Sequence, residues 1–289
     1  MNEFFFITFI VGVFLIYWYR DQPYLPKKIW MYWDNPDVPK IVAKCIRRIK
    51  QFNPRDEVVL LTKKTYKGYV TIPEELSGNP NFTNIFSDLV RLWVLTEHGG
   101  IWVDASTIVN ESFDWVFPWY YPETKEFSGF YLESATDKNK TFPIIQSWFL
   151  ACVKGSSFIR LWRDEFSRIG NFPSVDGYIN ACTHNGIDMQ NNRDPSAIHV
   201  AAQKILQIDR YPLDRLILRK AEDGEIYQGT VYVRFTTKIA PFAYLVRAKW
   251  DSEKALSSAC MMNYPMMTLR DVDRLVLDRS YYQCFFTDL

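Results

Sequence analysis

The sequence predicts an α/β protein built on a single, mostly parallel sheet with helices on its faces. Three observations carry this prediction. Strand-like and helix-like apolar segments alternate over residues 28–104, an order typical of parallel sheets. Residues 58–61 (VVLL) are continuously apolar, as expected for a strand buried on both faces. A helix-Gly-Gly-strand unit over residues 86–103 then leads to the carboxylate of Asp104.

The first half is predicted to run strand, helix, strand. Residues 28–33 (KIWMYW) have the composition of a first strand, and a turn rich in Asn, Asp and Pro follows. A helix is expected to begin at Pro39, because proline suits the first helical turn. Apolar residues at helical spacing form its buried stripe, and basic residues form its solvated face. The stripe consists of Ile41, Val42, Cys45, Ile46 and Ile49.

The stretch FSDLVRLWVLTEHGGIWVDAST, residues 86–107, is the centre of the predicted site. Its first part predicts a helix in which Asp88 and Arg91, three residues apart, project from one face. Gly99 and Gly100 end the helix, since glycine adopts a positive φ without a penalty from a Cβ atom. Asp104 then lies at the carboxyl end of a short buried strand, where parallel sheets bind ligands. The residues alone leave two interpretations open, a metal and anion site or an ordinary ion pair.

The second half is predicted to be less regular. Residues 142–153 (FPIIQSWFLACV) predict a buried helix, and residues 158–169 predict another. A third helix is expected to begin at Asp194 and Pro195, with the aspartate as its N-cap. Residues 231–235 (VYVRF) predict a late strand.

Residues 4–19 (FFFITFIVGVFLIYWY) carry no charge and predict an uncleaved membrane helix. A helix of this length spans about 24 Å, slightly less than the hydrocarbon core of a bilayer. The predicted organisation is an anchor at residues 1–20, a linker at residues 21–28 and a main domain at residues 29–289. A buried core helix is the alternative for the first segment.

The side of the membrane on which the main domain lies stays open. Basic residues that follow the anchor favour the cytoplasmic face by the positive-inside rule. Glycosylation sequons at Asn81, Asn110 and Asn139 would instead suit a Golgi-type lumen.

Composition excludes several classes of protein. With 34 basic and 33 acidic residues the net charge is +1, so bulk charge gives no reason to expect a nucleic-acid partner. The five cysteines include no C-x-x-C pair, and the three histidines include no H-E-x-x-H motif. A zinc site and a disulfide framework are therefore not expected, and the cysteines are predicted to be buried free thiols.

Four stretches together resemble the glycosyltransferases with sugar-binding D-x-D regions. The closest resemblance is to the capsular polysaccharide synthesis group, which is related to the family-32 glycosyltransferases. The central stretch, SDLVRLWVLTEHGGIWVDAST, is joined by IWMYWDNPDVP, NPRDEVVLLTKKT and IIQSWFLACVKGSSFI. The resemblance covers residues 28–159, and its combination of S-D-x-x-R with G-G-x-W-x-D is far more specific than a lone D-x-D.

The resemblance implies a GT-A fold with one Rossmann-like sheet and an irregular C-terminal acceptor part. It also implies a nucleotide-sugar donor, Mn²⁺ or Mg²⁺ as cofactor, and retention of configuration at the transferred sugar. A UDP-sugar is favoured over a GDP-sugar, and the acceptor would be a glycan or a glycoprotein. Residues 29–130 would form the half that binds the donor, and residues 131–289 the acceptor half.

The same resemblance implies roles for individual residues. Tyr32 and Trp33 would bind the nucleotide, with Trp33 stacked on the base. Asp88 and Arg91 would hold the donor sugar and its phosphate side, and Asp104 would coordinate the metal. These roles are chemically reasonable, because a departing nucleoside diphosphate develops negative charge that a metal and an arginine stabilise.

The metal motif departs from D-x-D. Its third position is Ser106, in the triplet Asp104-Ala105-Ser106, whereas many relatives carry a second aspartate there. The capsular group often has D-A-T at this place. A hydroxyl predicts weaker metal binding, completed by water and diphosphate oxygens. Two alternatives to an active transferase therefore stay open: a weak or inactive homologue that binds a sugar or nucleotide, and a nucleotide-sugar hydrolase.

Overall fold

The computed structural model describes most of the chain between Leu25 and Lys220, together with three strands further on. The predicted membrane helix at residues 4–19 lies outside this part. No helix among the described residues is long and apolar enough to cross a membrane. The described residues are 25–38, 40–105, 107–109, 112–117, 124–137, 141–192, 195–220, 231–234, 242–246 and 266–269.

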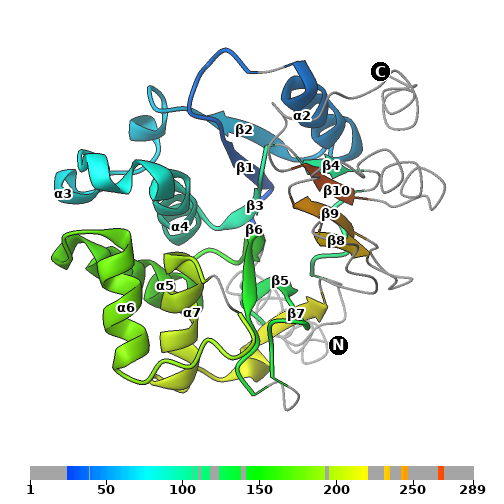
Figure 1. Ribbon diagram of the computed structural model, residues 1–289. Coiled ribbons are helices and arrows are strands. Elements are labelled where there is room, and N and C mark those ends of the chain that lie inside the picture. The colour runs from blue at the N-terminus through cyan, green and yellow to red at the C-terminus, as the bar shows by residue number, and fades with distance from the viewer. Residues whose placement is uncertain are drawn as a thin grey trace, which may run out of the picture.

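A six-stranded sheet runs through the middle of the molecule (Figure 1). Its strands are β1 (Lys28–Tyr32), β2 (Glu57–Leu61), β3 (Gly100–Val103), β5 (Phe127–Tyr131), β6 (Ile145–Cys152) and β7 (Leu216–Lys220). The strand order is β2-β1-β3-β6-β5-β7. The pairings make β6 antiparallel to both of its neighbours, whereas the other five strands all run in one direction. The prediction of an α/β protein with a mostly parallel central sheet is therefore confirmed.

A second sheet, which the sequence does not predict, lies beside the first. It consists of β4 (Thr107–Val109), β8 (Val231–Arg234), β9 (Phe242–Val246) and β10 (Met266–Leu269), in the order β4-β10-β9-β8. Strand β8 confirms the late strand expected at residues 231–235. The expectation of a single sheet is wrong, because these strands are short and come from distant parts of the chain, so local periodicity does not reveal their pairing.

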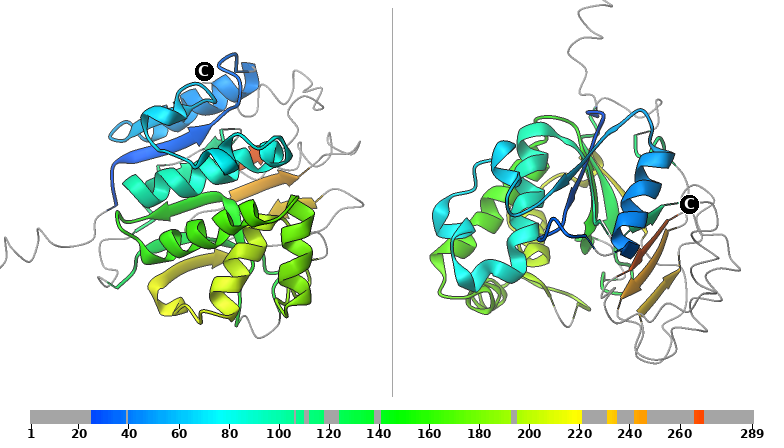
Figure 2. Two further views of the ribbon diagram at one scale, coloured as in Figure 1. Left: turned by 90° about the vertical axis from the view of Figure 1, so that its left-hand side faces the viewer. Right: turned by 90° about the horizontal axis from the view of Figure 1, so that it is seen from above.

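The helices lie on both faces of the central sheet (Figures 1 and 2). They are α2 (Lys40–Phe52), α3 (Glu74–Ser77), α4 (Phe86–His98), α5 (Ser157–Ser167), α6 (Val175–His184) and α7 (Ala197–Gln207). The short 3-10 helices are η1 (Tyr66–Gly68), η2 (Pro80–Ile85), η3 (Arg168–Asn171) and η4 (Leu213–Arg215). Helices α3 to α7 cover one face, whereas α2 and the second sheet lie on the other. Regular structure thus continues through the described residues as far as Lys220, and the second half contains more helices than the sequence predicts.

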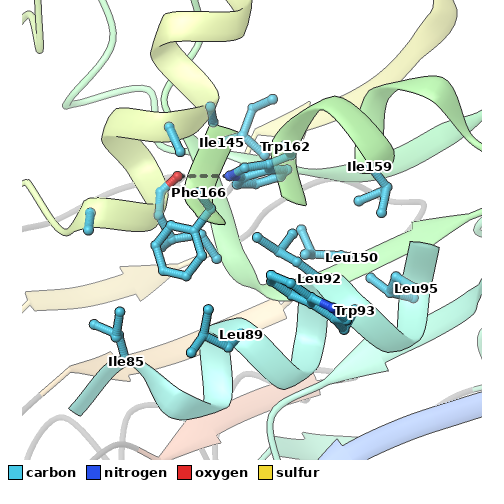
Figure 3. Close-up of a cluster of buried hydrophobic side chains, with 14 of the residues drawn as sticks. Ile85, Leu89, Leu92, Trp93, Leu95, Ile145, Leu150, Ile159, Trp162 and Phe166 are labelled. Atoms are coloured by element: carbon cyan, nitrogen blue, oxygen red, sulfur yellow. Dashed lines mark hydrogen bonds between the residues drawn. The ribbon is translucent and has the colours of Figure 1, made fainter. Parts of the chain in front are cut away.

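Helix α4 is held in place by apolar side chains that interlock with β6 and α5 (Figure 3). Leu92 of α4 and Leu150 of β6 are fully buried, as is Trp162 of α5. The indole N–H of Trp162 donates a hydrogen bond of 2.9 Å to the carbonyl oxygen of Ile198, so this large ring is buried without leaving a donor unpaired. Each such side chain contributes about 1.5–3 kcal/mol on burial. The helix that carries Asp88 and Arg91 is therefore anchored by the core.

The prediction of a helix at residues 142–153 is wrong, because this segment contains strand β6. All eight residues of β6 are buried, and the strand lies between β3 and β5. A continuously apolar run of this length carries no periodicity that distinguishes a buried strand from a buried helix.

Two smaller predictions are also wrong. Strand β2 is not buried on both faces, because it is the edge strand of the sheet and residues 57–60 are at least partly exposed. Helix α7 begins at Ala197 with Ser196 as its N-cap, not at Asp194. By contrast, the helix at residues 158–169 is confirmed by α5, with η3 after it.

The turn between α4 and β3 depends on glycine, as predicted. Gly99 and Gly100 have φ of 65° and 96°. A Cβ atom on Gly100 would lie 2.6 Å from the carbonyl oxygen of Lys28, on the neighbouring strand β1. Backbone conformation and strand packing therefore both require glycine at residue 100.

We expect Gly100→Ala to lower the free energy of unfolding by about 3 kcal/mol, from backbone strain of about 1 kcal/mol plus the contact with β1. Gly155 provides a matched control, since its φ is 81° and nothing lies within 4 Å of a Cβ atom there. Gly155→Ala should therefore cost about 1 kcal/mol, through strain alone. Urea unfolding measures both values, and equal losses would show that the contact with β1 has no effect.

The described cysteines Cys45, Cys152 and Cys182 are buried free thiols, as predicted, and Cys260 and Cys284 lie outside the described residues. Burial raises the pKa of the Cys45 thiol to about 12 and that of Cys152 in the same direction. A cysteine thiol in the unfolded chain has a pKa of about 8.5. The folded state therefore keeps these protons at pH values where the unfolded state loses them.

This difference makes stability depend on pH. The stabilisation is fully present below about pH 8.5 and is lost progressively as the pH rises towards the folded-state pKa of Cys45, about 12. At about pH 10 we expect Cys45 to account for a loss of about 2 kcal/mol relative to pH 7. Denaturant unfolding of the wild type and of Cys45→Ala at both pH values isolates this contribution. A variant that loses as much stability as the wild type between the two pH values would contradict the expectation.

Candidate functional site

The predicted site residues gather at the carboxyl edge of the central sheet. Strands β1 and β3 are adjacent and parallel, so Trp33, which follows β1, and Asp104, which follows β3, lie at the same edge. Helix α4 begins there too, because the ring of its first residue, Phe86, lies 5.7 Å from the ring of Tyr32 at the end of β1. The first turns of α4 therefore bring Asp88 and Arg91 to this edge.

Arg91 joins the two aspartates. Its Nη2 donates a hydrogen bond of 3.0 Å to Oδ1 of Asp104. Its Nη1 lies 3.0 Å from Oδ1 of Asp88, a charge contact without the angles of a hydrogen bond. The Arg91 side chain is 5% exposed, against 17% and 22% for Asp88 and Asp104. The prediction that Asp88 and Arg91 share one helix face is confirmed, and Asp104 joins them from β3.

Trp102 is a further member of this cluster that the sequence analysis did not identify. Its indole N–H donates a 3.1 Å hydrogen bond to Oδ1 of Asp104. The guanidinium carbon of Arg91 lies 5.0 Å from the centre of the same indole, within range of a cation–π interaction. The two-residue spacing of Trp102 and Asp104 along a strand was the available signal, since such residues project to the same face.

Oδ2 of Asp104 has no hydrogen-bond or ion-pair partner within the described part of the chain, whereas Oδ1 accepts bonds from two donors. A carboxylate oxygen of this kind is a suitable ligand for Mg²⁺ or Mn²⁺. Among the described residues no group of three or more His, Cys, Asp or Glu side chains could hold a metal ion. Ser106 lies outside the described residues. Oδ2 of Asp104 would therefore be one ligand of a bound metal, whose other ligands would have to come from substrate and water.

Tyr32 and Trp33 lie together at the end of β1 but have different surroundings. The Tyr32 hydroxyl donates a 2.6 Å hydrogen bond to Oδ1 of Asp34. Burial, followed by the effect of Asp34, raises the pKa of Tyr32 above its ordinary value, so this hydroxyl stays a protonated donor. The half-buried indole of Trp33 makes no ring contact or side-chain hydrogen bond with other described residues. Trp33 is thus the better placed of the two to stack on a ligand.

The buried arginine and its two carboxylates lie at the carboxyl edge of parallel strands. Many α/β proteins bind their ligands at this edge. A family model described as capsular polysaccharide synthesis protein matches residues 19–168, which is just over half of the 289-residue chain. The chain belongs to the capsular polysaccharide synthesis protein family. This match confirms the resemblance indicated by the motifs, and it supports the glycosyltransferase class and a role in polysaccharide synthesis.

Two solved structures of glycosyltransferases are similar to this chain, but their sequence identities and TM-scores are low. The PaToxG glycosyltransferase has 13% sequence identity and a TM-score of 0.37, with 64% of this chain and 70% of that chain covered. A glycosyltransferase involved in glycosylation of the major capsid of PBCV-1 has 12% identity and a TM-score of 0.38, with 67% and 81% covered. These scores are too low to define the chemistry of this chain. A search of curated proteins finds no significant match.

Proposed function

We propose that this protein transfers a sugar from a nucleotide-sugar donor to a glycan or glycoprotein acceptor, in a metal-dependent reaction that retains the configuration of the sugar. A UDP-sugar is favoured as the donor over a GDP-sugar. The observation that carries the proposal is the cluster of Asp88, Arg91 and Asp104 at the carboxyl edge of the sheet. Such a cluster, within a family of polysaccharide synthesis proteins, is suited to holding the diphosphate of a sugar donor.

Asp104 is the residue that would bind a metal. Its unpartnered Oδ2 is available as a ligand, while the bonds from Arg91 and Trp102 hold Oδ1 and fix the orientation of the carboxylate. A bound Mg²⁺ or Mn²⁺ would supply positive charge next to the leaving diphosphate. Ser106, which follows in the sequence, would contribute only a neutral hydroxyl.

Arg91 would act in two ways. It orients Asp88 and Asp104 by contacting both carboxylates. Its buried Nε has no hydrogen-bond partner within the described part of the chain, so an N–H donor remains for an anionic oxygen of the donor substrate. Asp88 would accept hydrogen bonds from the hydroxyl groups of the sugar, and Trp33 would stack on the base with Tyr32 packed beside it.

We propose that residues 4–19 anchor the enzyme as a single helix. The basic residues that follow them favour a main domain on the cytoplasmic face, and a lumenal domain is the alternative. The acceptor would be bound largely by residues 131–289.

The direct test is product analysis with the full-length protein in detergent. It is incubated with UDP- and GDP-sugars and glycan acceptors, with Mn²⁺, with Mg²⁺ and with a chelator, and the products are identified by mass spectrometry. We expect a glycosylated acceptor from one class of donor, and only when metal is present. Free sugar without a glycosylated acceptor would indicate a hydrolase, and binding without any product would indicate an inactive homologue. Either result would overturn the proposed function.

A further inference from the structure

Gln146 is a buried polar residue at the carboxyl edge of the central sheet, the edge at which the carboxylate cluster also lies. It lies near the start of β6, the strand that runs against all the others and therefore begins at the carboxyl edge of the sheet. The backbone N–H of Asp104 donates a 3.0 Å hydrogen bond to the carbonyl oxygen of Trp148, two residues further along β6. Gln146 thus lies two residues before Trp148 on β6, at the edge of the sheet where β3 ends.

The side chain of Gln146 has no protein partner. The residue is 7% exposed, and it makes no side-chain hydrogen bond with any other part of the described chain. Its amide carries two donor hydrogens and an acceptor oxygen. Because the residue keeps 7% of its surface exposed at this edge, the amide can meet solvent or a ligand there. The neighbouring Ser147 is also buried and makes no side-chain hydrogen bond with other described residues, but a single water molecule can satisfy one hydroxyl.

The backbone around Gln146 is irregular and at the same time well anchored. Across two residues of β5 the partner residue on β6 moves from Leu150 to Ile145, which marks a bulge that includes Gln146. Bulges beside active sites commonly direct a side chain out of its regular position. The chain entering β6 is fixed by Gln203, which is fully buried and donates a 2.9 Å hydrogen bond to the carbonyl oxygen of Pro143. Gln146 is therefore held on a rigid element, as a ligand-binding residue requires.

The order of the strands indicates which part of the substrate Gln146 meets. Strand β3, which leads to Asp104, lies between β1, which leads to Trp33, and β6. Neighbouring strands are about 4.8 Å apart. If the base lies at the end of β1 and the diphosphate at Asp104, the group beyond the diphosphate lies over the start of β6. In a nucleotide sugar that group is the sugar.

We propose that the side-chain amide of Gln146 binds a hydroxyl group of the transferred sugar and contributes to the choice of donor. The inference rests on the proposed function, since it takes a nucleotide sugar as the ligand. It adds a residue that neither the sequence motifs nor the family match assigns. An amide suits this task, because one hydroxyl can both donate to its oxygen and accept from its nitrogen.

The test compares Gln146→Met, which keeps the length of the side chain but removes its hydrogen bonds, with the wild type. Isothermal titration of the full-length protein measures Kd for UDP- and GDP-sugars and for free UDP and GDP, in the presence of Mn²⁺. We expect Kd of the bound nucleotide sugar to rise about 10-fold or more in the variant, with Kd of its free nucleoside diphosphate changed less than about 2-fold. The test also uses donor analogues that each lack one hydroxyl group of the sugar. For the analogue that lacks the hydroxyl bound by Gln146, we expect the wild type and the variant to have the same Kd.

Ser128→Ala is the matched control. Ser128 is a fully buried polar residue of β5 whose hydroxyl also has no hydrogen-bond partner within the described residues, but it lies away from the start of β6. We expect this variant to bind both kinds of ligand as the wild type does. Equal loss of affinity for the nucleotide sugar and the free diphosphate in Gln146→Met, or no loss, would overturn the inference alone. Failure of the wild type to bind any nucleotide sugar would overturn the proposed function and the inference with it.

Discussion

Asp104→Asn is expected to lower kcat/KM for sugar transfer by at least about 100-fold, the usual cost of removing one group that stabilises charge in a transition state. Asparagine has nearly the same shape and can still accept the hydrogen bonds from Arg91 and Trp102 through its oxygen. The substitution therefore removes the negative charge and one possible metal ligand while leaving the packing in place. Steady-state rates over a range of Mn²⁺ concentrations measure the effect.

Asp164→Asn is the control for this prediction. Asp164 is an exposed aspartate on α5 that pairs with Arg163 at the surface. Its replacement should leave the rate and the metal dependence unchanged. If Asp104→Asn folds with an unchanged circular dichroism spectrum and keeps full activity in the presence of metal, the role assigned to Asp104 is wrong.

Arg91→Leu is expected to lower the free energy of unfolding by about 3 kcal/mol and to abolish transfer. The substitution leaves the carboxylates of Asp88 and Asp104 close together without the cation that contacts both. Breaking a buried ion pair by removing one partner commonly costs about 3–5 kcal/mol, and the partial exposure of the two aspartates favours the lower end. Urea unfolding near neutral pH measures the loss.

Two further variants identify the cause of this loss. Arg160→Leu removes an exposed arginine that pairs with Asp164 at 3.7 Å, and it should change stability by less than about 1 kcal/mol. Adding Asp104→Asn to Arg91→Leu should restore part of the lost stability, because it removes one of the two unpaired charges. A double variant less stable than Arg91→Leu would show that the loss comes from packing against Trp102 rather than from charge.

The sequence predicts the part of the fold in which strands and helices alternate along the chain. Residues 28–104 alternate between strand and helix, and the predicted elements correspond to β1, α2, β2, α4 and β3. Glycine at the end of α4 and a carboxylate after β3 are local features, so they are visible without knowledge of the fold. The same local information places Asp88 and Arg91 on one helix face.

The remaining features depend on contacts between distant segments. Strand β6 has no periodicity because both of its faces are buried, so its sequence does not distinguish a strand from a helix. Its insertion between β3 and β5 places the start of β6, with Gln146, at the carboxyl edge of the sheet, and no local pattern encodes that placement. The second sheet, whose strand β4 pairs with β10, likewise joins residues more than a hundred positions apart in the chain.

The contacts to Oδ1 of Asp104 also affect how much free energy remains available for substrate binding. Arg91 and Trp102, which hold this oxygen, are both contributed by the folded chain itself. The rotational freedom of the carboxylate is therefore already lost when the protein folds, and little reorganisation of this group is needed when a ligand binds. Preorganisation of this kind leaves more of the contact energy to appear as affinity or as a lower barrier.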